Sequence, residues 1–117
     1  MTAVGFDFAG MKQAFETLDI PALIECYAED AEWIEYKPGA PPSAPRRMLG
    51  KAAIHQFVQG VADHKVKLFI SDEVIGDGRI AYSMRVETPD GRHGIEHVIA
   101  YHQNGKIIRQ IDVEAWD

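Results

Sequence analysis

The dipeptide Asn104-Gly105 lies between two runs rich in β-forming residues, and it constrains the fold of this chain more than any other feature. A two-residue type I′ turn needs positive φ at both central residues, and asparagine followed by glycine meets that need best. We therefore predict a hairpin here. Counting outward from the turn places His97 opposite Asp112, with both side chains on one sheet face and their Cβ atoms about 5 Å apart.

A histidine opposite a carboxylate has two interpretations. A carboxylate can fix the tautomer of an imidazole and raise its basicity, which is common in acid–base sites. A cross-strand pair of this kind can equally lie on a solvated surface, where an ion pair contributes little and has no chemical role. The predicted hairpin leaves both interpretations open.

Length and composition predict one compact domain over residues 1–117, since 46% of the 117 residues are hydrophobic.

The formal net charge of −6 argues against nucleic acid or an anionic membrane surface as a partner, because both attract clustered lysine and arginine. No apolar run is long enough to span a membrane, so a cytoplasmic protein is expected. The single cysteine, Cys26, excludes an intrachain disulfide and is expected to be a buried structural thiol.

Apolar spacing predicts helices in the first half of the chain. Hydrophobic residues recur every three or four positions over 7–17, 21–28 and 51–63. Alternation over 31–36 predicts a strand with Trp33 and Glu35 on one face. The segment 37–47 is rich in proline and must be a loop, which is either a disordered tip or a flap over a site.

The second half of the chain is a series of strand-like runs separated by glycine-containing turns. These runs, 66–75, 80–87, 95–101 and 107–113, predict an antiparallel meander. The expected fold class is thus α+β, with three N-terminal helices packed on a curved, mainly antiparallel sheet. A two-residue loop at 90–91 would pair Met84 with His97, and would place Arg85 and Glu96 as an ion pair on the reverse face.

Both faces of the predicted sheet carry apolar residues. On the face of His97 we expect Ile80, Tyr82, Met84, Val86, Ile95, Ile99, Tyr101, Ile108, Gln110, Asp112 and Glu114. On the reverse face we expect Val98, Ala100, Ile107, Ile111 and Val113. Helices can cover only one face, so the other implies a partner, most economically a second copy of this chain. Alternation does not say which face meets the helices.

Three segments together resemble the nuclear transport factor 2-like superfamily, in particular its SnoaL-like and ketosteroid-isomerase-like proteins. The segments are LIECYAEDAEWIEY, GKAAIHQFV and IEHVIAYHQNGKIIRQIDV, and their order and spacing extend the resemblance over nearly the whole chain. The resemblance implies a cone-shaped half-barrel whose concave sheet face and helices enclose an apolar pocket. It also implies a homodimer through the outer sheet face, with His97 and Asp112 inside the pocket.

The resemblance implies roles for particular residues as well. The base of the ketosteroid isomerases is an aspartate on the first strand, and Glu35 lies at the matching position. The tyrosine of their oxyanion site falls on Met11, which cannot donate a hydrogen bond, so that oxyanion hole is not intact here. In the SnoaL-type cyclases a histidine and an aspartate on the last two strands act together, and His97 with Asp112 resembles that pair.

A mechanistic hypothesis follows: Asp112 or Glu35 removes a proton next to the carbonyl of a small apolar compound, and His97 assists at the oxygen. No cofactor or metal is expected, because the histidines lack the spacing of zinc sites. The expected substrate-binding side chains are Trp33, Tyr82, Met84, Ile99, Gln110 and Tyr27. Two alternatives remain, a non-catalytic module that binds a small apolar molecule and an interaction domain that uses the fold only to dimerise.

Overall fold

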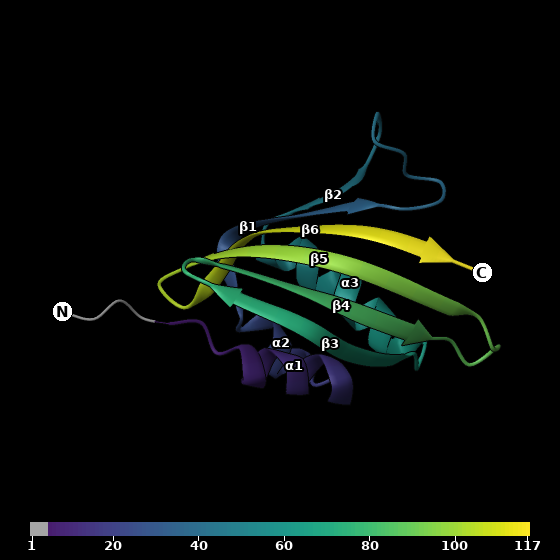
Figure 1. Ribbon diagram of the computed structural model, residues 1–117, viewed down its shortest axis with the longest axis horizontal. Coiled ribbons are helices and arrows are strands. Elements are labelled where there is room, and N and C mark those ends of the chain that lie inside the picture. The colour runs from purple at the N-terminus through teal and green to yellow at the C-terminus, as the bar shows by residue number, and fades with distance from the viewer. Residues whose placement is uncertain (1–4) are drawn as a thin grey trace.

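The computed structural model describes residues 5–117, which form three helices and six strands (Figure 1). The helices are α1 (Phe8–Thr17), α2 (Ile20–Ile24) and α3 (Lys51–Asp63). The strands are β1 (Tyr27–Tyr36), β2 (Arg46–Leu49), β3 (Lys67–Gly76), β4 (Arg79–Glu87), β5 (His93–Gln103) and β6 (Lys106–Trp116). The predicted α+β class is confirmed. Within residues 5–117, no helix is long and apolar enough to cross a membrane.

Side-chain caps begin the first two helices. Asp7 accepts a hydrogen bond from the amide of Gly10 at 2.9 Å, and Asp19 accepts one from the amide of Ala22 at 3.2 Å. Between them, Leu18 adopts a left-handed conformation with a φ of 54°. This conformation ends α1 and turns the chain into α2, so that the two helices pack against each other.

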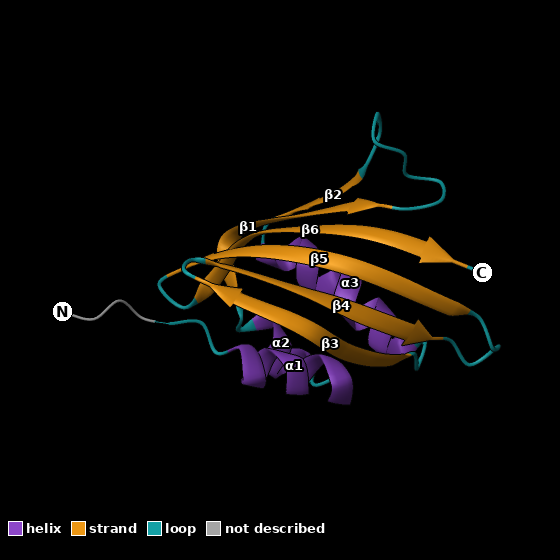
Figure 2. Cartoon of the chain, viewed as in Figure 1, coloured by secondary structure: helices purple, strands orange, loops and turns teal. Residues whose placement is uncertain are grey.

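The strands form one sheet in the order β2-β1-β6-β5-β4-β3 (Figure 2). Neighbouring strands are antiparallel except β1 and β6, which are parallel, so the prediction of a mainly antiparallel sheet is confirmed. The helices pack on one face, where α1 contacts β3 and α3 contacts β1 and β2. The sheet curves around this helical layer, and its closure into a cone stays a prediction.

The first strand is longer than predicted, and its partner β2 is absent from the prediction. β1 begins at Tyr27, which shortens the second helix that was expected over 21–28. β2 pairs back onto β1, because the chain reverses after a turn closed by backbone hydrogen bonds between Lys37 and Ala40. Residues 41–44 of this segment are exposed, and Figure 1 shows the segment projecting from the sheet edge. The segment extends the sheet edge, and whether it acts as a flap stays a prediction.

The hairpin at 104–105 is confirmed, and φ is positive at both of its residues. Beyond the second pair from the turn, however, β6 contains one extra residue, Ile108, in a β-bulge. Asp112 therefore lies opposite Val98, and the predicted pairing of His97 with Asp112 is wrong. A shift of one residue moves a side chain to the other sheet face. His97 is accordingly exposed on the outer face.

The connection between β4 and β5 is also longer than the predicted two residues. Residues 88–92 lie between the paired ends of the two strands. Met84 consequently lies opposite Glu96, and the predicted pairing of Met84 with His97 is wrong. Glu96 is buried on the inner face while Arg85 is exposed on the outer face, so the predicted ion pair between them is wrong as well. Each β5 side chain thus occupies the face opposite to the one predicted.

The outer face of the sheet retains exposed apolar side chains. Ile99 and Val113 are 43% and 56% exposed, respectively. Val98 and Ala100 were expected on this face, but they are buried in the core with the helices. A second copy covering the outer face stays a prediction. The apolar surface of that face includes Ile99 in place of Val98.

Candidate acid–base site

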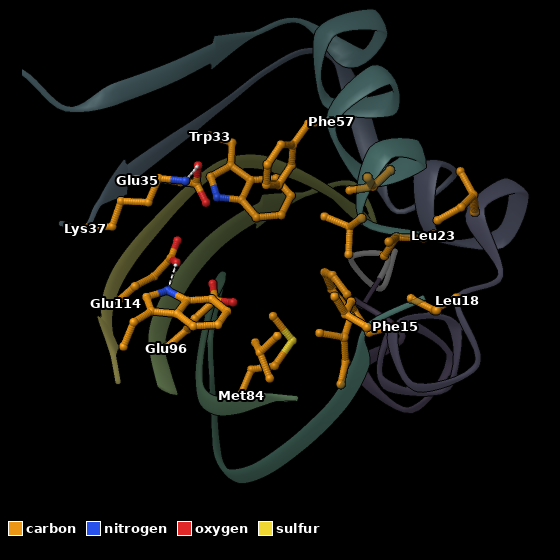
Figure 3. A pocket seen from close by; sticks show the side chains of 17 residues that line it. Phe15, Leu18, Leu23, Trp33, Glu35, Lys37, Phe57, Met84, Glu96 and Glu114 are labelled. Atoms are coloured by element: carbon orange, nitrogen blue, oxygen red, sulfur yellow. Dashed lines mark hydrogen bonds and ion pairs between the residues drawn. The ribbon is translucent and has the colours of Figure 1, made fainter. Parts of the chain in front are cut away.

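A cavity of about 150 Å³ lies between the helices and the inner face of the sheet (Figure 3). Its walls are mostly apolar and partly aromatic, since Trp33 meets Phe57 edge to face with ring centroids 5.3 Å apart. Further apolar wall residues include Phe15, Leu23, Val58, Leu68, Met84 and Val86. A dry cavity of this size holds a group as large as a single ring.

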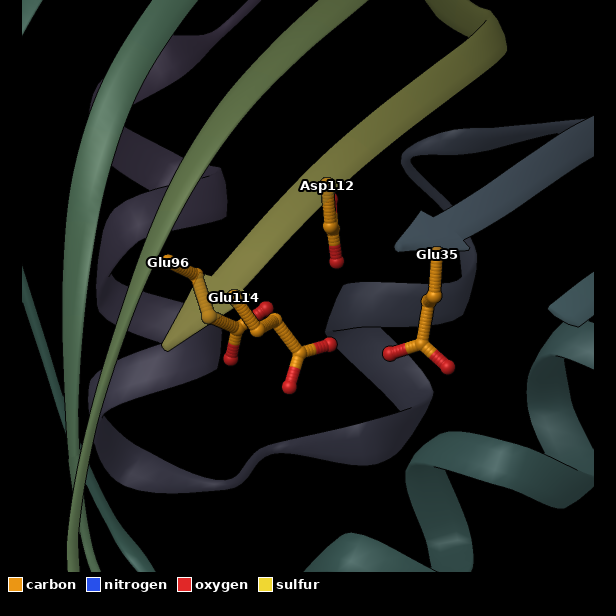
Figure 4. A group of neighbouring side chains, drawn as sticks. All are labelled: Glu35, Glu96, Asp112 and Glu114. Carbon is orange, nitrogen blue, oxygen red and sulfur yellow. The ribbon is translucent and has the colours of Figure 1, made fainter. Parts of the chain in front are cut away.

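Four carboxyl groups gather on the inner face beside this cavity, with oxygens within 4.8 Å of one another (Figure 4). Strand pairing brings them together, because β6 places Asp112 beside Glu35 of β1 and Glu114 opposite Glu96 of β5. Glu114 is half-buried, and the other three are buried. Carboxyls this close in an apolar setting cannot all be ionised, because burial and mutual repulsion both oppose charge.

Asp112 is fully buried, and both of its oxygens accept hydrogen bonds. The indole Nε1 of Trp33 donates to Oδ2 at 2.8 Å, and Nε2 of Gln110 donates to Oδ1 at 3.3 Å. The Tyr27 hydroxyl donates to Oε1 of Gln110 at 2.6 Å, which fixes the amide in this orientation. Burial raises the pKa of Asp112 to about 7, although hydrogen bonds with Glu96, Trp33 and Gln110 act to lower it.

Glu35 is buried and lines the cavity, and its Oε1 has no hydrogen-bond partner among the described residues. Two cations approach this oxygen, Lys37 Nζ at 3.7 Å and Arg46 Nε at 3.8 Å, both too distant for a hydrogen bond. Burial, together with the hydrogen bond and charge of Glu114, raises the pKa of Glu35 to about 8, and the charge of Lys37 offsets only part of this rise. Glu35 is therefore mainly protonated at neutral pH.

Glu114 is the second carboxyl with a free oxygen at the cavity wall. The indole Nε1 of Trp116 donates to its Oε1 at 2.9 Å, whereas Oε2 has no partner within residues 5–117 (Figure 3).

Glu96 also lines the cavity, and burial raises its pKa well above the ordinary range, with the charges of Asp112 and Glu114 adding to the effect. The cluster can therefore hold protons and exchange them with a molecule in the cavity.

The same four side chains offer the oxygen ligands that Mg²⁺ and Ca²⁺ prefer. Those ions take about six or more oxygens at about 2.0–2.6 Å. Oxygens within 4.8 Å of one another can surround an ion at such distances, but the apolar walls supply few further ligands. Without a bound ion, the raised pKa values of Glu35 and Asp112 favour protons on this cluster at neutral pH, and we interpret it as an acid–base site.

The structure brings together most of the residues predicted for the site. Glu35, Trp33 and Met84 line the cavity. Buried beside or behind its wall are Tyr27, Tyr82, Gln110 and Asp112. His97 and Ile99 are exposed on the outer face, so their predicted place in the pocket is wrong. The cause is the register of β5, which reverses the faces of that strand.

Glu96 and Glu114 are missing from the predicted site. Glu114 falls on the inner face by the same alternation that places Asp112 there, so a sequence signal for it exists. For β5 no such signal exists, because Ile95, His97 and Ile99 are about as apolar a set as Glu96, Val98 and Ala100. Only the loop before β5 and the bulge in β6 decide which set faces the cavity.

Comparison with known proteins identifies the fold. No family model matches the sequence, and no curated protein matches it either. Many solved structures match the fold, among them nuclear transport factor 2-like, ketosteroid-isomerase-like and SnoaL-like polyketide cyclase proteins. The chain therefore has the nuclear transport factor 2-like fold, and the predicted resemblance is confirmed at that level.

Three of these structures illustrate the likeness. A candidate ketosteroid isomerase from Kribbella flavida has a TM-score of 0.74 and 16% identity over 93% of this chain and 73% of its own. A candidate polyketide cyclase from Sinorhizobium meliloti has a TM-score of 0.68 and 17% identity over 87% of this chain and 88% of its own. TerC, co-crystallised with polyporic acid, has a TM-score of 0.71 and 18% identity over 93% of this chain and 87% of its own.

Proposed function

We propose that this protein is a cofactor-free enzyme that transfers protons on a small, mainly apolar carbonyl compound bound in the cavity. The observation that carries the proposal is the contact between Glu35 and Glu114, two carboxyls that each present an unpartnered oxygen at the cavity wall. Adjacent carboxyls that share one proton supply an acid and a base at the same place. The candidate isomerase and cyclase of the same fold support carbonyl chemistry.

The mechanism assigns one role to each member of this pair. Glu35 holds the shared proton at neutral pH, because its pKa is raised to about 8. Its O–H protonates the carbonyl oxygen of the substrate while the Glu114 carboxylate accepts a proton from the adjacent carbon, which leaves a neutral enol. In a substrate whose enol is conjugated with a carbon–carbon double bond, return of the Glu114 proton to the far carbon of that bond, and of the enol proton to Glu35, moves the double bond beside the carbonyl and completes an isomerisation. Attack of the enol carbon on a second carbonyl would instead close a ring, with the Glu114 proton passing to the new alkoxide oxygen and the enol proton returning to Glu35.

Asp112 acts on this pair without touching the cavity. Its charge raises the pKa of Glu35, and its hydrogen bond with Glu96 raises the pKa of Glu96. Hydrogen bonds from Trp33 and Gln110 favour the charged form of Asp112 and so oppose the effect of burial on its pKa. Asp112 is therefore a positioning residue in this proposal, and its expected role as the base passes to Glu114.

Proton exchange with solvent tests the proposal without knowledge of the natural substrate. The probe is 2-tetralone, a bicyclic ketone with acidic protons beside its carbonyl, followed by NMR in D₂O. We expect the protein to accelerate exchange over buffer, and Glu35→Gln to lower that acceleration by about 10²–10⁴-fold. Glu32→Gln is the matched control, because Glu32 lies on the same strand but pairs with Arg47 and Arg109 away from the cavity. Chelation by EDTA should leave the rate unchanged.

Two results would count against catalysis. Exchange no faster than in buffer would exclude proton transfer on such ketones. Equal rates for wild type and Glu35→Gln would remove Glu35 from the mechanism. If the ketone binds without exchange, the alternative of a non-catalytic binding module is the better account of the cavity.

We also propose that the outer sheet face is covered by a second copy of the chain. The support is the exposed apolar pair Ile99 and Val113 at the centre of the sheet, where β5 and β6 meet. Sedimentation should show a dimer at micromolar concentration, and Val113→Lys should dissociate it. Val74→Lys, at a residue that is 67% exposed on β3 near the sheet edge, is the control. A wild-type monomer would contradict this arrangement.

A further inference from the structure

An open groove of about 1040 Å³ continues from the cavity to the protein surface. The two spaces share wall residues, since Lys37, Phe57, Val61, Val66 and Trp116 line both. The groove is bounded by β2, by α3 and by the loop that connects β4 and β5. A molecule bound in the cavity would therefore extend into this groove, which forms the mouth of the site.

The charge of the mouth is opposite to that of the whole chain. Lys37, Arg46, Arg47 and Arg92 line it, with Asp90 as the single acidic residue among its described lining residues. The chain as a whole has 18 acidic and 12 basic residues. Four cations against one anion in a single groove therefore make a local field that attracts negative charge.

These cations differ in the partner that each one has. Arg47 pairs with Glu32 at 3.6 Å, whereas Lys37 and Arg46 lie 3.7 and 3.8 Å from Glu35, which is mainly protonated at neutral pH. No carboxylate lies within 4.0 Å of the Arg92 guanidinium in the part of the chain that the structure describes. Unpaired guanidinium groups retain free donors for a carboxylate, sulfonate or phosphate.

Aromatic rings hold two of these cations at the opening. The Arg46 guanidinium lies 4.7 Å from the centroid of Phe57, and that of Arg92 lies 5.3 Å from the ring of Trp116. Both rings also line the cavity. Stacking of this kind restricts the guanidinium without using its hydrogen-bond donors. The cations are thus fixed at the point where a ligand would leave the cavity.

We propose that the ligand of this site carries an anionic group, which Arg92, Arg46 and Lys37 bind at the mouth while the apolar part enters the cavity. The inference rests on the proposed function in that the same cavity receives the substrate. The opposite orientation is unfavourable, because an anion inside would lie against Glu35, Glu96 and Glu114. An anion fixed at the mouth therefore selects one orientation of the substrate, with its uncharged end toward the carboxyl pair.

The test uses 2-naphthoate and 2-naphthamide, two bicyclic molecules of the same shape that differ in charge. Titration calorimetry at pH 6.5 and low salt should show that wild type binds the anion about tenfold more tightly than the amide, as two or three partly exposed charge pairs would give. Arg92→Gln should lower this preference by about threefold and Arg92→Glu by more, with affinity for the amide nearly unchanged. High salt should also reduce the preference.

Arg85→Gln is the matched control. The Arg85 guanidinium stacks 5.5 Å from the ring of Phe69, as Arg92 does on Trp116, but it lies on β4 and does not line the groove. It should keep the full preference for the anion. Equal affinities of wild type for the two compounds, or a preference that Arg92→Gln leaves intact, would overturn the proposal while the amide still reports a functional cavity. If neither compound binds, the anion site is wrong and the proposed substrate cavity fails with it.

Discussion

Glu96 and His97 are consecutive residues of β5, yet they lie in opposite environments. Glu96 is 7% exposed, and its carboxyl lies together with three others beside an apolar cavity. The His97 ring lies in solvent on the outer face, where Nδ1 is 3.3 Å from the Ser83 hydroxyl. Imidazole is the usual acid–base group near neutral pH, but here burial and neighbouring charge confer that property on carboxyls instead. The sheet face, rather than the residue type, decides which side chain can do chemistry.

The largest expected difference between the two faces is in catalysis. Glu114→Gln removes the proton acceptor of the proposed pair, and it should reduce the exchange of 2-tetralone protons by about 10²–10⁴-fold. His97→Gln should leave that rate unchanged, because its side chain does not reach the cavity. NMR in D₂O measures both variants. A His97→Gln enzyme as slow as Glu114→Gln would break the comparison.

The pH dependence of stability should reflect the buried carboxyls of the inner face. Unfolded carboxyls titrate near pH 4, whereas folded Glu35 and Asp112 titrate at about 8 and about 7. Between these values the folded state binds more protons than the unfolded state, so stability should fall as pH rises from about 5 to 7. The slope should be up to about 1.4 kcal/mol per pH unit for each group.

Urea unfolding at several pH values measures this slope. Glu35→Gln, whose amide cannot ionise, should remove the contribution of Glu35 to the slope of stability against pH. Glu32→Gln, on the opposite side of β1, should leave the slope unchanged. Stability that rises with pH over this range would mean that the inner carboxyls are ionised in the folded protein.

A smaller effect is expected from the hydrogen bonds that support the inner face. Trp33→Phe removes the indole donor to Asp112 and leaves a buried oxygen without it, which should cost about 1–3 kcal/mol of unfolding free energy. Tyr101→Phe, a similar loss of one polar group on the outer face, should change stability by no more than about 0.5 kcal/mol. Urea unfolding at pH 7 compares the two. Equal costs would argue that the Trp33 hydrogen bond contributes little.

The smallest effect should come from His97 itself. His97→Asn alters a side chain with one weak contact within its own chain, so in the Val113→Lys background, expected to be monomeric, the unfolding free energy should change by no more than about 0.5 kcal/mol. Thermal unfolding at pH 7 is a sufficient check. A pronounced loss in that background would show that His97 has a further partner within its own chain.

The sequence predicts local features of the fold better than the register between strands. Asn104-Gly105 forms its turn, and the helix expected over 7–17 forms as Phe8–Thr17, because each depends on residues close together in the sequence. The bulge at Ile108 has no comparable signal, since an ordinary residue can occupy it. One extra residue there, and a longer loop before β5, exchange His97 for Glu96 in the site.

The acid–base pair is difficult to predict for a related reason. The resemblance singles out Glu35, the hairpin count and the resemblance single out Asp112, and both residues lie on the inner face. Their chemistry, however, depends on Glu96 and Glu114, whose approach follows from register and from burial under the helices. Shifted pKa values are properties of the assembled site and are not visible in the residue types.

The most direct test is a ¹³C NMR titration of the glutamate side-chain carboxyl carbons, with Glu35 identified by the signal that Glu35→Gln removes. The account predicts that this signal titrates with a midpoint near pH 8, about where burial and Glu114 place it. A Glu35 midpoint near its ordinary value of about 4.3 would contradict the shared proton, and with it the proposed chemistry.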